Sequence, residues 1–292
     1  MTLYDIKLTL HYDYTGAVRR GHHQIRVTPL TIPGIQRAVA SSLSFAPEPT
    51  DRSDFTDFFG NAVTSISYRK PHDALDVKMS ARVDVSRPEP GFDVSPGLPA
   101  LRAEIAAMRS LARDAPHHFL GPTDYAGVED AITAYAGRSL SAASVIGIAG
   151  DLCDRIHDDF GYDGEATDVS TTASDAFALK RGVCQDFAHV MIAGLRGVGI
   201  PAGYVSGFLR TIPPPGKKRL EGIDAMHAWV RVWCGREAGW REFDPTNRMH
   251  EGNDHIVAGY GRDYGDVAPI VGVLKSTGGQ EGEQSVDVIP LP

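Results

Sequence analysis

The segment between Lys180 and Gly199 constrains the fold more than any other part of the chain. It places one cysteine, Cys184, two residues after Gly182 and at the start of a run whose apolar residues recur at helical spacing. Glycine allows a tight turn before the helix, and Gly199 followed by Pro201 ends it. The pattern therefore predicts a buried helix with a thiol in its first turn. The helix dipole and the unpaired N–H groups at that end favour the thiolate, which is the nucleophilic form.

The composition limits the class of protein that can use such a cysteine. A chain of 292 residues with 42% apolar and 23% charged residues is long enough for two globular domains. A formal net charge of −8 argues against nucleic-acid binding, and the sequence has neither a signal-peptide pattern nor an apolar run long enough to cross a membrane. Three cysteines are too few for a disulfide framework, so the expected location is the reducing cytoplasm.

The first third of the chain has the pattern of a β-rich domain. Polar and apolar residues alternate over residues 3–10, 62–68 and 75–85, which predicts an antiparallel sheet or sandwich across residues 1–87. Residues 88–99 are rich in proline and glycine and are the expected linker, followed by a second domain over residues 100–292. His22 and His23 are adjacent in a predicted strand and face opposite sides, so we expect no metal site there.

Helices are expected over residues 101–111, 125–135 and 141–157, ahead of the cysteine turn. Cys153 and His157 have the spacing of a helical metal site, but Cys153 lies in the apolar stripe and is expected in the core. The acidic loop over residues 161–168 lacks the regular ligand ladder of an EF-hand. We therefore expect neither a metal nor a cofactor.

A nucleophilic thiol needs a nearby base, and the base needs an orienting group. Asp186 and His189 lie roughly 200° and 140° around the helix from Cys184, so both should point away from it. Residues 225–233 form a clean alternating pattern that carries His227, and residues 239–244 form the expected partner strand, which ends at Asp244.

The register of this hairpin decides whether His227 and Asp244 can meet. Pairing Trp233 with Trp240 or with Ala238 puts His227 and Asp244 on one face, as direct or diagonal neighbours. A carboxylate beside an imidazole fixes its tautomer and stabilises the imidazolium. A lone strand histidine is usually a packed or surface residue, and it is the combination with Cys184 that favours catalysis.

These motifs together resemble the bacterial transglutaminase-like superfamily. The resemblance rests on the stretch from Arg181 to His189, on Met226-His227-Ala-Trp229 and on Phe243-Asp244-Pro245. In the first third, the pattern of the family's β-rich N-terminal region is matched at five places: His11-Tyr-x-Tyr14, Arg26-Val-Thr-Pro29, Gln36, Gly60-Asn61 and Pro71-His72.

The resemblance implies an α+β fold in which a papain-like core follows the β-rich domain. It implies that Cys184 is the nucleophile, His227 the base and acid, and Asp244 the orienting carboxylate, with chemistry through a thioester. The backbone N–H of Cys184 would serve an oxyanion hole, and Tyr162 and Gln185 are candidate side-chain donors or substrate contacts.

The expected partner is a peptide or protein amide, and hydrolysis is favoured over transfer to an amine because water is the default acceptor. Two alternatives stay open: a non-catalytic peptide-binding module that keeps the fold, and a zinc site that uses Cys184 and His227 with further ligands. The sequence carries no indication of an oligomeric state.

Overall fold

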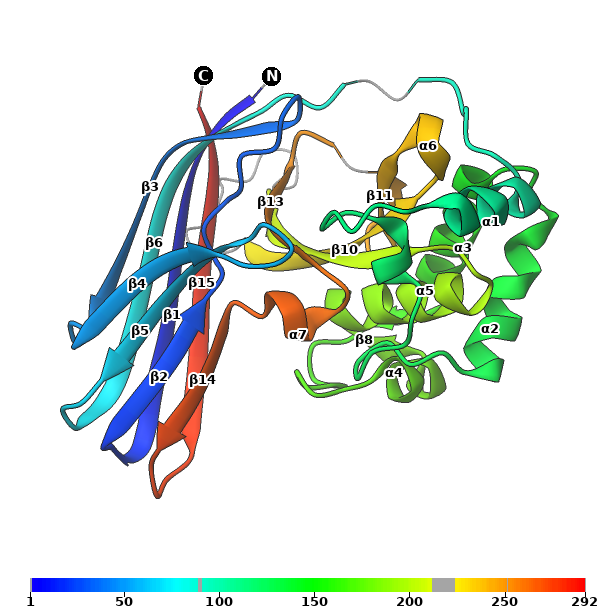
Figure 1. Cartoon of the computed structure of the whole chain (residues 1–292). Coiled ribbons are helices and arrows are strands. Elements are labelled where there is room, and N and C mark those ends of the chain that lie inside the picture. The colour runs from blue at the N-terminus through cyan, green and yellow to red at the C-terminus, as the bar shows by residue number, and fades with distance from the viewer. Residues whose placement is uncertain (1, 89–90, 212–223, 251, 292) are drawn as a thin grey trace, which may run out of the picture.

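The computed structural model describes residues 2–88, 91–211, 224–250 and 252–291. Figure 1 shows two parts, a tall β-rich part that contains the first and the last strands, and a mixed part in which helices surround a sheet. The fold is α+β with antiparallel principal sheets, which confirms the predicted fold class. Among the described residues, none of the helices has the length and apolar character needed to cross a bilayer.

The β-rich part consists of two four-stranded antiparallel sheets, with the strand orders β15-β1-β6-β3 and β14-β2-β5-β4. Alternate residues of β1 fill the core between them: Tyr4, Ile6, Leu8 and Leu10 are all at most 3% exposed. In β1, β5 and β6 the period-two pattern therefore has the physical basis expected from the sequence, because one face of each of these strands is buried. The strand bounds are β1 Thr2–Val18, β2 Arg20–Ile25, β3 Gln36–Ala46, β4 Asp51–Thr56, β5 Ala62–Tyr68, β6 His72–Val85, β14 Ile270–Lys275 and β15 Gln280–Leu291.

The last two strands correct the expected extent of the second domain. β14 pairs with β2, and β15 pairs with β1 from Leu3 to Tyr14, so residues 270–291 belong to the sheets of the β-rich part. The expectation that residues 100–292 form a single core therefore does not hold at its C-terminal end. Strand pairing joins segments that are distant in sequence, and local alternation does not reveal the partner.

The second part is built on a five-stranded antiparallel sheet with the order β12-β11-β10-β9-β13. Helix α5 packs on this sheet, and its buried residues share one apolar cluster with Ala228, Val230 and Val232 of β10. The strand bounds are β9 Ala202–Leu209, β10 Ala225–Trp233, β11 Trp240–Asp244, β12 Met249–His250 and β13 His255–Gly261, and a separate short parallel pair joins β7 Gly161–Tyr162 to β8 Arg181–Gly182.

The helices differ from the sequence expectation mainly at their ends. The first expected helix ends at Ala107, the second begins only at Asp130, and the third is capped by Ser144, whose hydroxyl accepts from Gly147 N, and not by Ser141. The helix bounds are α1 Leu98–Ala107, α2 Asp130–Gly137, α3 Val145–Asp159, α4 Ala173–Leu179, α5 Cys184–Gly197, α6 Gly235–Ala238 and α7 Tyr264–Val267, with short 3₁₀ turns at Pro116–Phe119 and Arg138–Ser141.

Two amide side chains of the β-rich part fasten it to the sheet of the second part. β13 is an edge strand of that sheet, and its outer backbone groups need partners. Gln36 donates to Val257 O and accepts from Val257 N, both at 2.8 Å. Asn61 makes the same pair of bonds with Tyr260, again at 2.8 Å. Each amide therefore supplies the donor and the acceptor that a neighbouring strand would offer to β13. These four hydrogen bonds hold the β-rich part against the edge of the second sheet.

Candidate active site

The turn before α5 presents Cys184 at the first position of the helix. Gly182 has a φ of 154°, and a Cβ at this position would collide with the carboxylate of Asp186. That carboxylate accepts from Val183 N at 2.8 Å and from the Thr167 hydroxyl at 2.7 Å. Asp186 thus holds the turn, the backbone-bonding role expected for it, while Cys184 itself is half-buried.

Three aromatic rings surround Lys180, the residue at which this turn begins, and sequence analysis did not identify this arrangement. Lys180 ends α4 in a left-handed conformation with a φ of 53°. Its ammonium lies 3.3 Å from the ring centroid of Phe177, 4.4 Å from that of Phe160 and 4.5 Å from that of Tyr135. Cation–π attraction therefore compensates for partial burial, which lowers the pKa of Lys180.

The hairpin of β10 and β11 adopts the register that pairs Trp233 with Trp240. In this register His227 and Asp244 are diagonal neighbours on one face, and His227 Nε2 lies 2.7 Å from Asp244 Oδ2. The side chain of Cys184 also lies close to His227 and is one of the groups that raise the pKa of that imidazole. Since Nε2 is engaged by the carboxylate, Nδ1 is the nitrogen left for the thiol. The three predicted residues therefore form one connected chain of contacts.

The groups around His227 favour the protonated, positively charged form of its imidazole. Burial by itself lowers the pKa of His227, but the Cys184 side chain and Asp244 outweigh it and raise the pKa to about 10. The side chain of His227 is 9% exposed and that of Asp244 is fully buried. Burial alone would raise the pKa of Asp244, yet its hydrogen bonds to His227 and His255 hold that pKa far below the usual range.

Asp244 is surrounded by more donors than the sequence revealed. Its Oδ2 also receives Asn247 Nδ2 at 2.7 Å and His255 Nε2 at 3.1 Å, and its Oδ1 accepts from the backbone N–H groups of Thr246 and Asn247. His255 begins β13 and is 1% exposed. Residues Ile256-Val257-Ala258 form a continuous apolar run, which is compatible with a buried strand but does not reveal its neighbour in the sheet.

The three side chains His227, Asp244 and His255 offer ligand atoms within 4.8 Å of one another, which is the geometry of a possible metal site. The hydrogen bonds of His255 argue against this use. Its Nδ1 accepts from Gly252 N at 3.3 Å, so Nε2 carries the proton and donates to Asp244. A metal would need that nitrogen without its proton. The donor set therefore fits a carboxylate held by two imidazoles better than an ion.

The two candidate oxyanion donors occupy different positions. Tyr162 pairs with Gly182 in the short β7–β8 ladder and is 66% exposed; partial burial raises the pKa of its hydroxyl, and the nearby Cys184 charge adds to the shift. Gln185 is 8% exposed and donates to Val169 O at 3.1 Å. That contact occupies the Gln185 amide, so Tyr162 is the better placed of the two.

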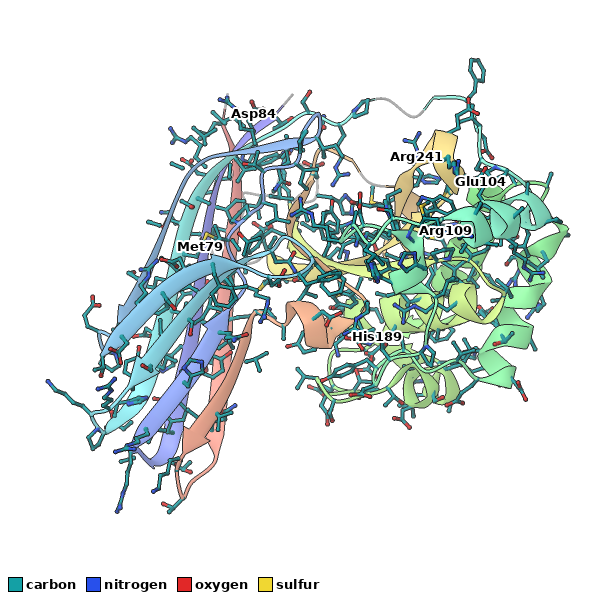
Figure 2. The ribbon with its side chains drawn as sticks, viewed as in Figure 1. Met79, Asp84, Glu104, Arg109, His189 and Arg241 are labelled. Atoms are coloured by element: carbon teal, nitrogen blue, oxygen red, sulfur yellow. The ribbon has the colours of Figure 1, made fainter. Side chains whose placement is uncertain are left out.

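Two buried residues, His189 of α5 and Tyr204 of β9, pack against each other between the helix and the sheet. His189 is fully buried in the interior of this part of the molecule (Figure 2), and burial lowers its pKa to about 3. Its Nε2 accepts from Tyr264 N at 3.2 Å, and it does not pair with Asp186. Tyr204 on β9 packs against it, with ring centroids 5.1 Å apart. Cys153 is likewise buried in the core, as expected.

Comparison with family models identifies two regions. Residues 4–84 match the bacterial transglutaminase-like N-terminal region, and residues 133–245 match the transglutaminase-like superfamily. The second match contains Cys184, His227 and Asp244. The first contains Gln36 and Asn61, the two amides that dock onto β13.

Two relatives and one solved structure extend the comparison. The uncharacterized protein Rv2569c of Mycobacterium tuberculosis is 37% identical over 99% of this chain and 93% of its own length. A protein-glutamine gamma-glutamyltransferase of Pseudomonas aeruginosa is 32% identical over 35% of this chain and 16% of its own. The crystal structure of a candidate cysteine protease from Cytophaga hutchinsonii has the same fold, with a TM-score of 0.76 at 21% identity over 100% of this chain and 91% of that one. The chain therefore belongs to the transglutaminase-like superfamily.

Proposed function

We propose that this protein is a thiol enzyme that transfers the acyl group of a peptide or isopeptide amide through a thioester. The observation that carries the proposal is the position of His227, which lies next to both Cys184 and Asp244 and has a side chain only 9% exposed to solvent. A half-buried thiol joined to a carboxylate-backed imidazole is suited to nucleophilic attack on an amide.

In the proposed reaction, the Cys184 thiolate attacks the amide carbonyl and forms a tetrahedral oxyanion. The backbone N–H of Cys184, at the start of α5, would donate to this oxyanion, with Tyr162 as the candidate side-chain donor. His227 then gives its proton to the departing amine, and the thioester remains. An incoming water or amine next loses a proton to His227 and releases the acyl group, while Asp244 keeps the imidazole oriented.

We propose hydrolysis as the main outcome, because water is the default acceptor where no amine site is apparent. The expected substrate is a protein or peptide amide. Cys153 and Cys184 carry free thiols, which supports the proposed cytoplasmic location.

The proposal is tested with casein and a fluorescent primary amine, comparing the natural protein with Cys184→Ala. New amino termini or released ammonia without amine incorporation would support hydrolysis, and incorporation of the amine would move the assignment to transamidation. Added hydroxylamine should trap the acyl group as a hydroxamate. If the natural protein and Cys184→Ala give the same hydrolysis, amine incorporation and hydroxamate formation, the proposal is wrong and the non-catalytic peptide-binding module becomes the better interpretation.

A further inference from the structure

A groove of about 430 Å³ opens between the two sheets at the β14–β15 edge of the β-rich part. Its walls are alternate residues of neighbouring strands: Leu10, Tyr12 and Tyr14 of β1, and Ile270, Gly272 and Leu274 of β14. Since each series spans five strand positions, the groove follows the strand direction for about 13 Å. Alternate residues of β15 complete it, so the shape is that of a channel for an extended chain.

Several polar groups in the groove have no protein partner. His23 is 3% exposed, and its Nε2 forms no hydrogen bond with the described residues. The hydroxyls of Tyr12, Tyr14 and Tyr264 also make no hydrogen bond to the described part of the chain, although all three line the groove. A buried polar atom is normally satisfied, so His23 Nε2 is the unusual member of this set, whereas the tyrosine hydroxyls remain open to solvent. Four groups without a protein partner around one apolar groove fit a ligand that supplies hydrogen bonds to them.

Two glycines keep the groove open. A Cβ at Gly272 would collide with the His23 ring, and a Cβ at Gly282 would lie 2.9 Å from the Tyr12 ring. Both rings can therefore lie against strand backbone while their polar atoms remain at the groove. A side chain at either glycine would push a ring into the space that a ligand would occupy.

The groove is joined to the helix that carries Cys184. Its wall residue Val169 accepts from the Gln185 amide, one position after the cysteine, and its wall residue Tyr264 donates its N–H to His189 of the same helix. β14 follows directly on α7, so the Ile270 end faces the second part and the hairpin end lies away from it (Figure 1). One end of the groove therefore lies beside residues that contact helix α5, the helix that begins with Cys184.

The lining selects for an uncharged occupant. Burial raises the pKa of Tyr12 to about 12 and lowers that of His23 to about 4, so both are neutral at physiological pH. Among the described lining residues there is one carboxyl group, that of the exposed Glu283, and no lysine or arginine. Phenol and imidazole groups match the carbonyl and N–H groups of a main chain, and β14 and β15 are both edge strands, which can accept a further strand.

We propose that this groove binds an extended, uncharged segment of the polypeptide substrate, with every second side chain turned into it. The inference rests on the proposed acyl transfer, because it supplies the part of the substrate that lies beyond the reacting amide. The β-rich part is then a substrate-binding element in addition to a structural partner of the second part.

The test uses a fluorescein-labelled nonapeptide of alternating leucine and serine, which presents apolar side chains to one face. Binding is measured by fluorescence anisotropy on Cys184→Ala, so that it does not depend on acyl transfer. We expect saturable binding that weakens about tenfold in Cys184→Ala/Tyr12→Ala, equivalent to ~1.4 kcal/mol. Val273 lies on the opposite face of β14 and is 78% exposed, so adding Val273→Ala should leave the affinity unchanged.

A second measurement locates the peptide even if the Tyr12 variant folds poorly. A photoreactive leucine in the nonapeptide should crosslink to tryptic fragments that contain residues 269–284 or Tyr12. Absence of saturable binding, equal weakening by Val273→Ala, or crosslinks confined to other regions would each overturn the proposal. Because Cys184 is absent from the assay, these results are separate from a failure of the thiol to react.

Discussion

His255 donates from Nε2 to Oδ2 of Asp244 across 3.1 Å, and both side chains are buried. The same oxygen is the one that His227 contacts at 2.7 Å. One carboxylate oxygen therefore serves two imidazoles with different tasks: His227 faces the thiol, and His255 is locked as a neutral donor by Gly252 N. We infer that His255 positions Asp244 for its contact with His227.

Replacing His255 should disturb His227 without touching the thiol. In His255→Phe, Asp244 loses one donor, so we expect a less well fixed carboxylate and a lower pKa for His227. Because the thiolate is then less well stabilised by the imidazolium, the onset of Cys184 alkylation should move to higher pH. In His255→Gln, an amide N–H can replace Nε2 and should restore much of the profile. The measurement is the rate of iodoacetamide alkylation against pH, and identical profiles in the two variants would contradict this role.

The contact between His227 and Cys184 predicts a reactivity that depends on the histidine. Because the pKa of His227 is raised to about 10, its positive charge persists through neutral pH and is lost as the pH rises through that value. We expect His227→Ala to slow alkylation of Cys184 at pH 7 by at least about tenfold, since the thiolate loses its cationic partner. His250, exposed on β12 of the same sheet, provides the control His250→Ala. Equal rates in all three proteins would remove the basis for the proposed mechanism.

The buried histidines predict a loss of stability in acid. Burial is the main reason that the pKa of His23 falls to about 4, against about 6.5 in an unfolded chain. Between these values the unfolded state binds more protons, so the free energy of unfolding should fall as the pH drops from about 6.5 to 4, with a contribution on the order of 3 kcal/mol from His23. His189 should add to the fall, because its pKa is lowered to about 3.

Urea unfolding at pH 7 and pH 5 checks this contribution. His23→Phe should lessen the difference between the two pH values, whereas His22→Ala should not, because His22 is exposed on the other face of β2. A difference that is the same in both variants would show that His23 is not the group responsible.

The docking amides predict a local but large effect on stability. Gln36→Ala leaves the N–H and C=O of Val257 without their partner, and an unsatisfied buried group costs roughly 1–3 kcal/mol. We expect the free energy of unfolding to fall by about 3 kcal/mol. Ser41 is exposed on the same strand, β3, so Ser41→Ala should change stability by less than about 0.5 kcal/mol. Similar unfolding midpoints for the two variants would show that the amide does not hold the two parts together.

The hydrogen-bond pattern around Asp244 predicts that metal removal has no effect. Dialysis against EDTA should leave both the melting temperature and the alkylation rate of Cys184 unchanged, because His255 donates a proton where a metal ligand would offer a lone pair. Loss of either property after dialysis, and its return with zinc, would revive the metal alternative at His227, Asp244 and His255.

The part of the site that rests on local patterns was predictable from the sequence. The alternation in β10 and β11 defined which face each residue occupies, so His227 and Asp244 could be placed together, and the structure selects one of the two registers considered. The glycine turn and the helix dipole similarly placed Cys184 at the start of α5. These features depend on residues within one helix or one hairpin.

The features that sequence analysis missed depend on partners distant in the chain. His255 meets Asp244 only because β13 belongs to the same sheet, and Lys180 is caged by rings from α2, the end of α3 and α4. Gln36 and Gly60-Asn61 were noted as a family pattern, yet their function as docking amides appears only when β13 is in place. Strand order and long-range contacts are set by the total packing, which local periodicity does not encode.

The pairing of β1 with β15 has a consequence for how the chain folds during synthesis. β1 leaves the ribosome more than 250 residues before β15 Gln280–Leu291, which forms one of its two neighbours. The sheet β15-β1-β6-β3 therefore stays incomplete, with one edge of β1 unpaired, until nearly all of the second part has been translated. The β-rich part therefore cannot complete its first sheet before the second part has been translated, as it could if it were made of one continuous segment. The exposed edge of β1 should need protection from aggregation in the nascent chain.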